Sequence, residues 1–354
     1  MTTNPFFQQY RPSIEDSIRD FIAKKREELS SINIWGNDLM QRFSGFLGQG
    51  KMIRGCLVIL SYLMYEGKVP EWIIKTASAV ELIHSSLLVH DDIMDRDHVR
   101  RGNKTLFAQY QELGERKKYH DSAHFGESLG ICAGDIGFFL AFETLSEIDI
   151  NPDLKVEIFG LWSKELTYVG LAQMQDVYFS ISGMEPGEDE ILDLYRFKTA
   201  RYTFSLPLMT GAILAGKDNK TIAHLEKLGE CIGIIFQIKD DEIGLFGDEL
   251  EIGKPIGTDI EEGKKTIYSH YLIKSLHGED KKLVQNILSK KINTKSAIAD
   301  LKKMAQKAHV QDKIKKKIFE LSEKAGQLIQ SLNIEVKYRN ILLDILEYNI
   351  YRER

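Results

Sequence analysis

Apolar residues recur along most of this chain at intervals of three and four, the spacing that places them on one face of an α-helix. Such faces are evident in segments 80–88, 232–238 and 314–321. The alternation of apolar and polar residues that would indicate strands does not recur, and most of the seven prolines fall between the helical segments. The pattern predicts about a dozen helices and an all-α fold.

Composition does not divide the chain. No shift in composition marks a linker among the 354 residues, so we expect one helical domain over residues 1–354. The Lys-rich region from residue 281 onward keeps helical periodicity and is expected to pack on the same bundle. Within it, apolar residues interleave with the basic run Lys313–Lys317. We interpret that run as the solvated side of a helix.

Charge and hydropathy exclude several classes of protein. With 43% hydrophobic and 28% charged residues, the chain can bury a sizeable core. A net charge of −5 gives no global basic field, so we expect no nucleic-acid partner. No apolar stretch is expected to serve as a signal peptide or to reach the roughly 18–20 residues of a membrane span. The three scattered cysteines, without CxxC spacing, indicate a reducing compartment, and we expect a cytoplasmic protein.

An acidic motif follows the apolar segment 80–88. Asp91 and Asp95 are four residues apart, so on a helix both carboxylates point from the same side and repel each other unless a cation binds between them. Oxygen ligands without a neighbouring Cys or His favour Mg²⁺. Arg100 and Arg101 follow, and guanidinium groups bind phosphate in a bidentate manner. Taken alone, such a motif is more often a solvated helix end.

A second acidic motif changes that interpretation. Asp240 and Asp241 also follow an apolar helical run, far downstream of the first motif. Two acidic turns of this kind predict the two walls of one polyphosphate site.

Eight short motifs in a fixed order carry a family resemblance. They are GQGKMIR at 48–54, HSSLLVHDDIMD at 84–95, RRG at 100–102, AGD at 133–135, AQMQD at 172–176, KTA at 198–200, FQIKDD at 236–241 and GKPIGTDIEEGKKT at 253–266. Together they resemble the trans-type (all-E) prenyl diphosphate synthases, which include farnesyl and geranylgeranyl diphosphate synthases. The resemblance implies a single large helical bundle around a deep central cavity, usually assembled as a homodimer.

The resemblance also implies an activity. Members of this family join isopentenyl diphosphate to an allylic diphosphate by ionisation, condensation and elimination. They use Mg²⁺, with three ions when substrate is bound, and the released diphosphate would act as the base. A departing diphosphate needs cations to stabilise it, whereas the allylic cation needs a dry apolar pocket.

Family positions assign roles to individual side chains. The metal ligands would be Asp91 and Asp95 on one wall, supported by Asp92, and Asp240 on the other. The allylic diphosphate would be held by Arg100, Lys198 and Lys254, with Lys264 as a weaker candidate. The isopentenyl diphosphate site would consist of Lys51, Arg54, His84 and Arg101. Thr199 and Gln237 would stabilise the passing cation, while Asp135 and Asp176 are expected to form structural hydrogen bonds.

The chain departs from the family pattern at two motifs. Met52 replaces an arginine and Gly55 a proline in the first motif, so the isopentenyl site is expected to survive in weakened form. Gly244 stands where the family usually has a third aspartate of the second acidic motif. A water-mediated metal contact would then be missing or moved to Glu242 or Asp248.

A third departure concerns product length. Ser86 lies five residues before Asp91, where farnesyl-type enzymes commonly carry an aromatic residue. The small side chain is expected to leave the cavity open, with Ile83 or a residue on a neighbouring helix forming its floor. Geranylgeranyl diphosphate is therefore the expected product, and a chain of C25 or more is the next candidate. Less favoured are a non-catalytic partner subunit and a class I terpene cyclase, and a cyclase would need no isopentenyl site.

Overall fold

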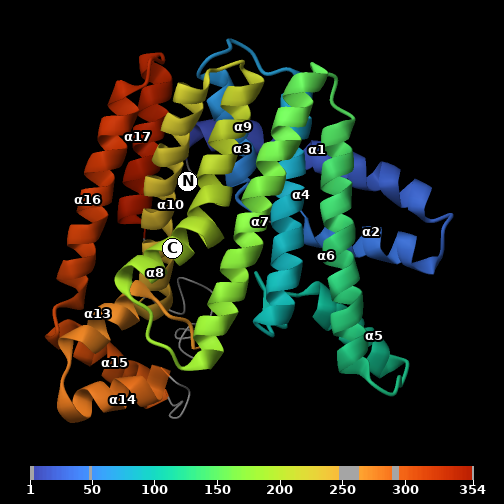
Figure 1. Ribbon diagram of the computed structural model, residues 1–354. Helices are drawn as coiled ribbons and strands as arrows, with labels where there is room; N and C mark the ends of the chain where they lie inside the picture. The colour runs from blue at the N-terminus through green and yellow to red at the C-terminus, as the bar shows by residue number, and fades with distance from the viewer. Residues whose placement is uncertain (1–3, 48–49, 247–262, 289–294, 353–354) are drawn as a thin grey trace. The chain divides into compact units, whose positions relative to one another are not determined.

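The computed structural model describes residues 4–47, 50–246, 263–288 and 295–352 (Figure 1). Helices make up most of this part of the chain, so the prediction of an all-α fold is confirmed. Contacts along the backbone group the chain into two compact units, Met1–Val156 and Glu157–Arg354. One domain over residues 1–354 stays a prediction.

The first unit is built from α1 (Pro5–Leu29), α2 (Ile34–Phe46), α3 (Ile53–Leu63), α4 (Glu71–Met94), α5 (Leu106–Arg116) and α6 (Ser122–Ser146). Helix α3 is buried at every position because it is apolar on nearly all sides. Helix α4 packs against both α3 and α6. The acidic end of α4 is therefore carried on a helix that the core of this unit holds on more than one side.

Glycines of α6 allow it to lie close to α4. A Cβ atom built on Gly134 would lie 2.3 Å from His90 Nε2, and one built on Gly137 would lie 2.2 Å from Ser86 Oγ. Real Cβ contacts are essentially never this short, so a larger residue at either position would force the facing side chain to move. The α4–α6 contact leaves little space beside Ser86.

A short hairpin follows α4. Strands β1 (Val99–Arg100) and β2 (Asn103–Lys104) pair antiparallel, with Val99 opposite Lys104. The two turn residues, Arg101 and Gly102, have φ angles of 53° and 77°, as a type I′ turn requires. The sequence pattern predicted no strand here, because two residues per strand are too few to show alternation.

The second unit contains α7 (Pro152–Ser182, from residue 157 onward), α8 (Glu188–Tyr195), η1 (Arg196–Ser205), α9 (Leu206–Leu214), α10 (Asn219–Phe246), α13 (Ile267–Ser275), α14 (Gly278–Leu288), α15 (Lys295–Lys307), α16 (Val310–Ser331) and α17 (Val336–Tyr351). Segment η1 is a π-helix, which the sequence pattern did not predict. Pro207, just beyond it, has no N–H to donate and disfavours regular α-helical bonding to the residues before it.

Two helices of the first unit are long and apolar enough to cross a membrane by length and composition, namely α4 and α6. The expectation that no apolar stretch reaches that length is therefore wrong by this criterion. Much of each apolar window is buried inside the protein, and the two helices pack on each other. Core helices satisfy the same criterion, so the finding gives only weak support to a membrane segment.

Candidate active site

The first acidic motif lies at the C-terminal end of α4. Asp91 is in its last turn and Asp95 caps it, with the Asp95 N–H donating to the Asp91 carbonyl over 2.8 Å. The C-terminal end of a helix carries partial negative charge, so neighbouring carboxylates are unfavourable there unless a cation compensates them. The position of this pair therefore indicates a cation site.

Asp92 faces inward and is held by Arg100. Its side chain is 1% exposed, and Arg100 Nε donates to Asp92 Oδ1 over 2.5 Å. Burial raises the pKa of Asp92 to about 7, against the opposing effect of Arg100. Arg100 Nη2 also lies 3.6 Å from Asp91 Oδ2 and 3.7 Å from Asp97 Oδ2. Asp97 was missed in the sequence, although it is the last of four aspartates between residues 91 and 97.

Positive side chains gather beside this motif. Burial, followed by the charges of Arg54, Arg101 and Arg100, lowers the pKa of His84 well below its usual value, so the imidazole is neutral near pH 7. Burial and the charges of Arg100 and Arg54 lower the pKa of Arg101, against the opposing effect of Glu81. Part of each shift comes from neighbouring positive charge, which suits an anionic ligand. The structure thus brings together three of the four residues assigned to the isopentenyl diphosphate site, and Lys51 is partly exposed on the segment before α3.

Gly55 has a structural reason to replace the family proline. Its N–H donates to Glu81 Oε1 over 2.8 Å, a bond that proline could not form. A Cβ atom there would also lie 2.9 Å from the Ala77 carbonyl oxygen. Burial raises the pKa of Glu81, while Arg54 acts in the opposite direction. Met52 is buried, so it adds packing and no charge to the anion site.

A cavity of about 570 Å³ in the first unit adjoins these cations. Its lining includes Arg100, Arg101, Arg42 and Lys104, together with the carboxylate of Asp38. Arg42 Nε donates to Asp38 over 2.8 Å, and the other charged residues of the lining are cations, of which Arg100 and Lys104 also form ion pairs with nearby carboxylates. Arg42 and Lys104 could not be found from the sequence, because neither belongs to a motif.

The second acidic motif lies near the end of α10 and repeats the division of roles. Asp240 has 43% of its side chain exposed, whereas Asp241 is buried. Gln237 Nε2 donates to Asp241 Oδ1 over 2.9 Å, and the Tyr195 hydroxyl donates to Asp241 Oδ2. That hydroxyl in turn accepts the Ile267 N–H over 2.8 Å. Asp241 therefore joins α8, α10 and α13, and Asp240 is the more accessible carboxylate.

Arg352, just beyond α17, contacts this motif directly. Its Nη2 pairs with Asp240 Oδ1 and donates to the Phe236 carbonyl over 2.9 Å. The guanidinium also stacks 3.9 Å from the centre of the Phe236 ring. No sequence signal could have found this residue, because its partners lie on a helix more than a hundred residues earlier.

The structure connects three predicted residues of the second unit with their neighbours. The Thr199 hydroxyl donates to Gln237 Oε1 over 2.8 Å. The Lys198 ammonium forms an ion pair with Asp176 of α7. Asp176, expected to be structural, thus holds a residue assigned to the allylic diphosphate.

Some predicted residues have other surroundings. Lys264 lines a small cavity of about 30 Å³ with Asp241 and Gly244. Glu242, one proposed substitute for the missing aspartate, pairs with Lys239 one turn earlier. Lys254 and Asp248 lie outside the described residues.

The two residues assigned to product length are both buried in α4. The Ser86 hydroxyl donates to the Leu82 carbonyl over 2.9 Å and faces Gly137 of α6. Ile83 lies nearly one turn earlier and is also buried. An open cavity at Ser86 stays a prediction.

The donor set fits Mg²⁺ bound together with a phosphate ligand. Across the described residues, no group of three or more His, Cys, Asp or Glu side chains is arranged to hold a metal ion. Asp91 and Asp95 provide carboxylate oxygens only. Mg²⁺ commonly binds through one or two carboxylates and completes its coordination with water and substrate phosphates.

Comparisons with known proteins agree with this chemistry. A short chain isoprenyl diphosphate synthase of Methanocaldococcus jannaschii is 36% identical over 242 residues, which cover 68% of each chain. A geranylgeranyl diphosphate synthase of Sulfolobus acidocaldarius is 29% identical, over 83% of this chain and 81% of that protein. The solved structure of geranylgeranyl pyrophosphate synthase from Corynebacterium glutamicum is 26% identical and superposes with a TM-score of 0.91, over 97% of this chain and 99% of that one.

The family assignment rests on the greater part of the sequence. The profile of the polyprenyl synthetase family matches residues 38–307, which include both acidic motifs and the segment of Lys198 and Thr199. The chain belongs to the polyprenyl synthetase family of trans-prenyltransferases.

Proposed function

We propose that this protein joins isopentenyl diphosphate to an allylic diphosphate and that its main product is geranylgeranyl diphosphate. The observation that carries the proposal is the repeated division of roles in the two acidic motifs. In each motif, the second aspartate is buried and hydrogen-bonded to neighbouring side chains, while the first is more exposed. Relatives named geranylgeranyl diphosphate synthases in Sulfolobus acidocaldarius and Saccharolobus solfataricus support the product assignment.

We expect Asp91, Asp95 and Asp240 to hold Mg²⁺, three ions when substrate is bound. The C. glutamicum enzyme was solved with magnesium and isoprenyl diphosphate, which supports the assignment. Bound Mg²⁺ would supply Lewis-acid stabilisation of the charge on the departing diphosphate. Arg100 and Lys198 would add fixed positive charge at the same group, with Lys254 and Lys264 as further candidates.

Isopentenyl diphosphate would bind to cations instead of metal. Arg54 and Arg101 lie in a region where neighbouring positive charges already shift the pKa of His84 and of Arg101 itself. An incoming diphosphate relieves that repulsion, which favours its binding. Neutral His84 would donate one hydrogen bond, and Lys51 would supply a further positive charge.

The reaction then needs few proton transfers from side chains. The allylic C–O bond breaks and its electron pair leaves with the diphosphate. The isopentenyl double bond supplies the pair for the new C–C bond, and the resulting cation loses a proton to the released diphosphate. The paired oxygens of Thr199 and Gln237 would stabilise the passing positive charge by their dipoles.

The protein is proposed to act as a homodimer in the cytoplasm. Helix α6 exposes Phe139 and helix α7 exposes Met174 and Ile181, all large apolar side chains that a second copy could cover. Cys56, Cys132 and Cys231 are free thiols, as a reducing compartment permits.

One incubation tests the function. The purified full-length protein is mixed with Mg²⁺, isopentenyl diphosphate and either dimethylallyl, geranyl or farnesyl diphosphate, and the dephosphorylated prenyl alcohols are identified by mass. The proposal expects the twenty-carbon alcohol from every starter. Longer alcohols would indicate a polyprenyl synthase, and no elongation would indicate a non-catalytic subunit. Hydrocarbon released from the allylic substrate alone would indicate a cyclase.

A further inference from the structure

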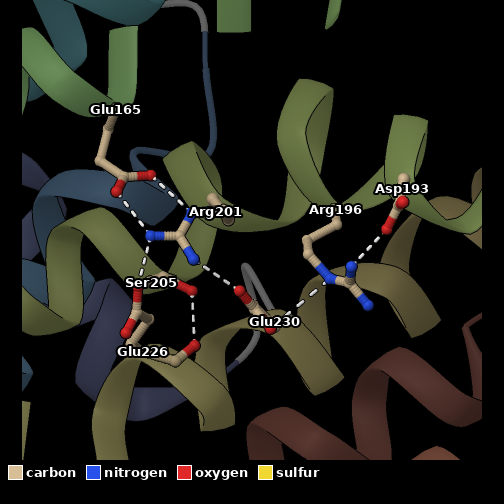
Figure 2. A network of polar contacts seen from close by, with 7 residues as sticks. All are labelled: Glu165, Asp193, Arg196, Arg201, Ser205, Glu226 and Glu230. Atoms are coloured by element: carbon tan, nitrogen blue, oxygen red, sulfur yellow. Dashed lines mark hydrogen bonds and ion pairs between the residues drawn. The ribbon is translucent and has the colours of Figure 1, made fainter. Parts of the chain in front are cut away.

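A cluster of charged side chains surrounds Arg201, and the proposed reaction does not use it (Figure 2). Arg201 lies within η1, three residues after Lys198, and its side chain is 8% exposed. Its Nε and Nη2 donate to the two oxygens of Glu165 on α7, over 2.9 and 2.6 Å. Its Nη1 donates to Glu230 over 2.6 Å, and its Nη2 also reaches Glu226, both on α10. One guanidinium therefore links three helical segments.

The charge in this cluster is permanent. Burial lowers the pKa of Arg201, but the adjacent Glu165 and Glu226 carboxylates raise it overall, so the guanidinium stays protonated. The bidentate contact with Glu165 fixes orientation as well as distance, which a lysine could not do. Losing the guanidinium would leave several carboxylates close together in a largely buried place.

Close backbone contact also joins η1 to α10. A Cβ atom on Gly229 of α10 would lie 2.4 Å from Ser205 N, and one on Gly233 would lie 2.4 Å from Ala200 Cα. The Ser205 hydroxyl also donates to the Glu226 carbonyl over 2.7 Å (Figure 2). At these two glycines, the main chain of α10 lies directly against the main chain of η1.

The contacts of Lys198 and Thr199 use the same two neighbouring helices. Lys198 pairs with Asp176 of α7, which lies about three turns beyond Glu165 on that helix. Thr199 donates to Gln237 of α10. Lys198, Thr199 and Arg201 all lie within this π-helix, whose i→i+5 hydrogen bonding is rare in proteins. We expect it to need support from the neighbouring helices.

We propose that Arg201 is the positioning residue that holds η1 in its π-helical register and so aims Lys198 and Thr199 at the reacting groups. The inference rests on the proposed roles of Lys198 and Thr199. Arg201 itself touches no substrate. It acts by clamping η1 between Glu165 on one helix and the Glu226–Glu230 pair on the other.

A double-mutant cycle tests this proposal. The variants are Arg201→Gln, Lys198→Ala and the two combined, each assayed for kcat and for KM of both substrates. Arg201→Gln should lower kcat by about 10- to 100-fold, because small misplacement of a reacting group is costly. The KM for isopentenyl diphosphate should change less than about twofold, because cations of the first unit are assigned to that substrate. In the Lys198→Ala background the same change should cost less than about threefold.

A second readout does not depend on turnover. Amide hydrogen exchange within residues 196–205 should accelerate in Arg201→Gln, and Arg201→Lys should recover only part of the protection. Arg196→Gln is the matched control, since Arg196 begins the same segment but does not bind Glu165. Its Nη1 pairs with Asp193, and its Nε lies 3.6 Å from Glu230 Oε2. It should change kcat less than about twofold.

Several results would overturn the inference. They are losses in kcat that multiply in the double variant, amide hydrogen exchange in η1 that is unchanged by Arg201→Gln, or full protection of η1 in Arg201→Lys. If Arg201→Gln does not fold, Glu165→Gln removes one charge from the bidentate contact and should show the same pattern at about 3- to 10-fold. A wild-type protein without prenyl elongation would contradict the proposed function, while the exchange measurement would still decide whether Arg201 holds η1.

Discussion

Arg100 Nε donates to Asp92 Oδ1 over 2.5 Å, so Asp92, the second aspartate of the first acidic motif, is both buried and paired. In the second motif Asp241 is likewise buried, and it accepts hydrogen bonds from Tyr195 and Gln237. Adjacent aspartates with similar chemistry thus do different work. One holds neighbouring segments together, and the other is proposed to bind a cation.

Metal dependence should follow this division. Asp91→Asn removes a carboxylate charge from the partly exposed pair Asp91 and Asp95, so the Mg²⁺ concentration for half-maximal activity should rise at least about tenfold. Chelation of divalent metal should abolish turnover in the wild type. A magnesium titration of the steady-state rate measures both, and an unshifted titration in Asp91→Asn would contradict the assignment.

Asp92 should matter for folding stability. Asp92→Ala leaves Arg100 without its closest partner in a largely buried position, so the free energy of unfolding should fall by about 3 kcal/mol or more. Denaturant unfolding followed by circular dichroism gives the value. Asp95→Ala is the control, since Asp95 is only partly buried, and it should cost less than Asp92→Ala.

The neutral state of His84 predicts a pH dependence. The unfolded chain protonates this imidazole near pH 6.5, whereas burial and neighbouring arginines keep it neutral in the folded protein to a lower pH. The unfolded state therefore binds more protons below about pH 6.5, so stability falls as the pH drops through that value. The decline between pH 7 and pH 5 should be shallower in His84→Gln, as urea midpoints would report. Parallel curves for the two proteins would refute it.

Product length should respond at Ser86. Ser86→Phe is expected to shorten the main product towards farnesyl diphosphate, because the ring would occupy space along α4 that a growing chain could use. Gly137 stands directly opposite, so the ring would also press on α6 and lower stability by about 1–3 kcal/mol. Ser86→Ala, which adds no volume, should leave product length unchanged. Unaltered products from a folded Ser86→Phe enzyme would mean that the chain grows elsewhere.

The contact of Arg352 with Asp240 predicts an opposite shift in metal affinity. Arg352→Ala removes a positive charge from beside a proposed metal ligand, so the Mg²⁺ concentration for half-maximal activity should fall by about 3- to 10-fold. Arg352→Lys keeps the charge and should lie between wild type and the alanine variant. A higher magnesium requirement in Arg352→Ala would show that the arginine assists the site.

The sequence supported the helical class and the paired aspartates because both are local patterns. Helical faces repeat within a few residues, and Asp91 and Asp95 are one turn apart. Pairings between distant segments could not be predicted in that way, such as Arg352 with Asp240 or Arg201 with Glu165.

Two local features were also missed. The π-helix depends on contacts with α7 and α10 in addition to the proline after it, and the two-residue strands are too short to show a periodic pattern. Glu81 lies beside a recognised motif, yet its role depends on a backbone N–H that is available only because residue 55 is not proline.

Gly229 and Gly233 have a wider consequence. At both glycines the contact between α10 and η1 is formed by main-chain atoms. Such a contact contains no side-chain rotamers, so rotamer changes cannot weaken it. The groups proposed to stabilise the allylic cation are thus held on a stiff contact between two helices, whereas the residues assigned to product length lie on α4. An enzyme arranged in this way can acquire a new product length by changes on α4 while its reactive centre keeps the same alignment.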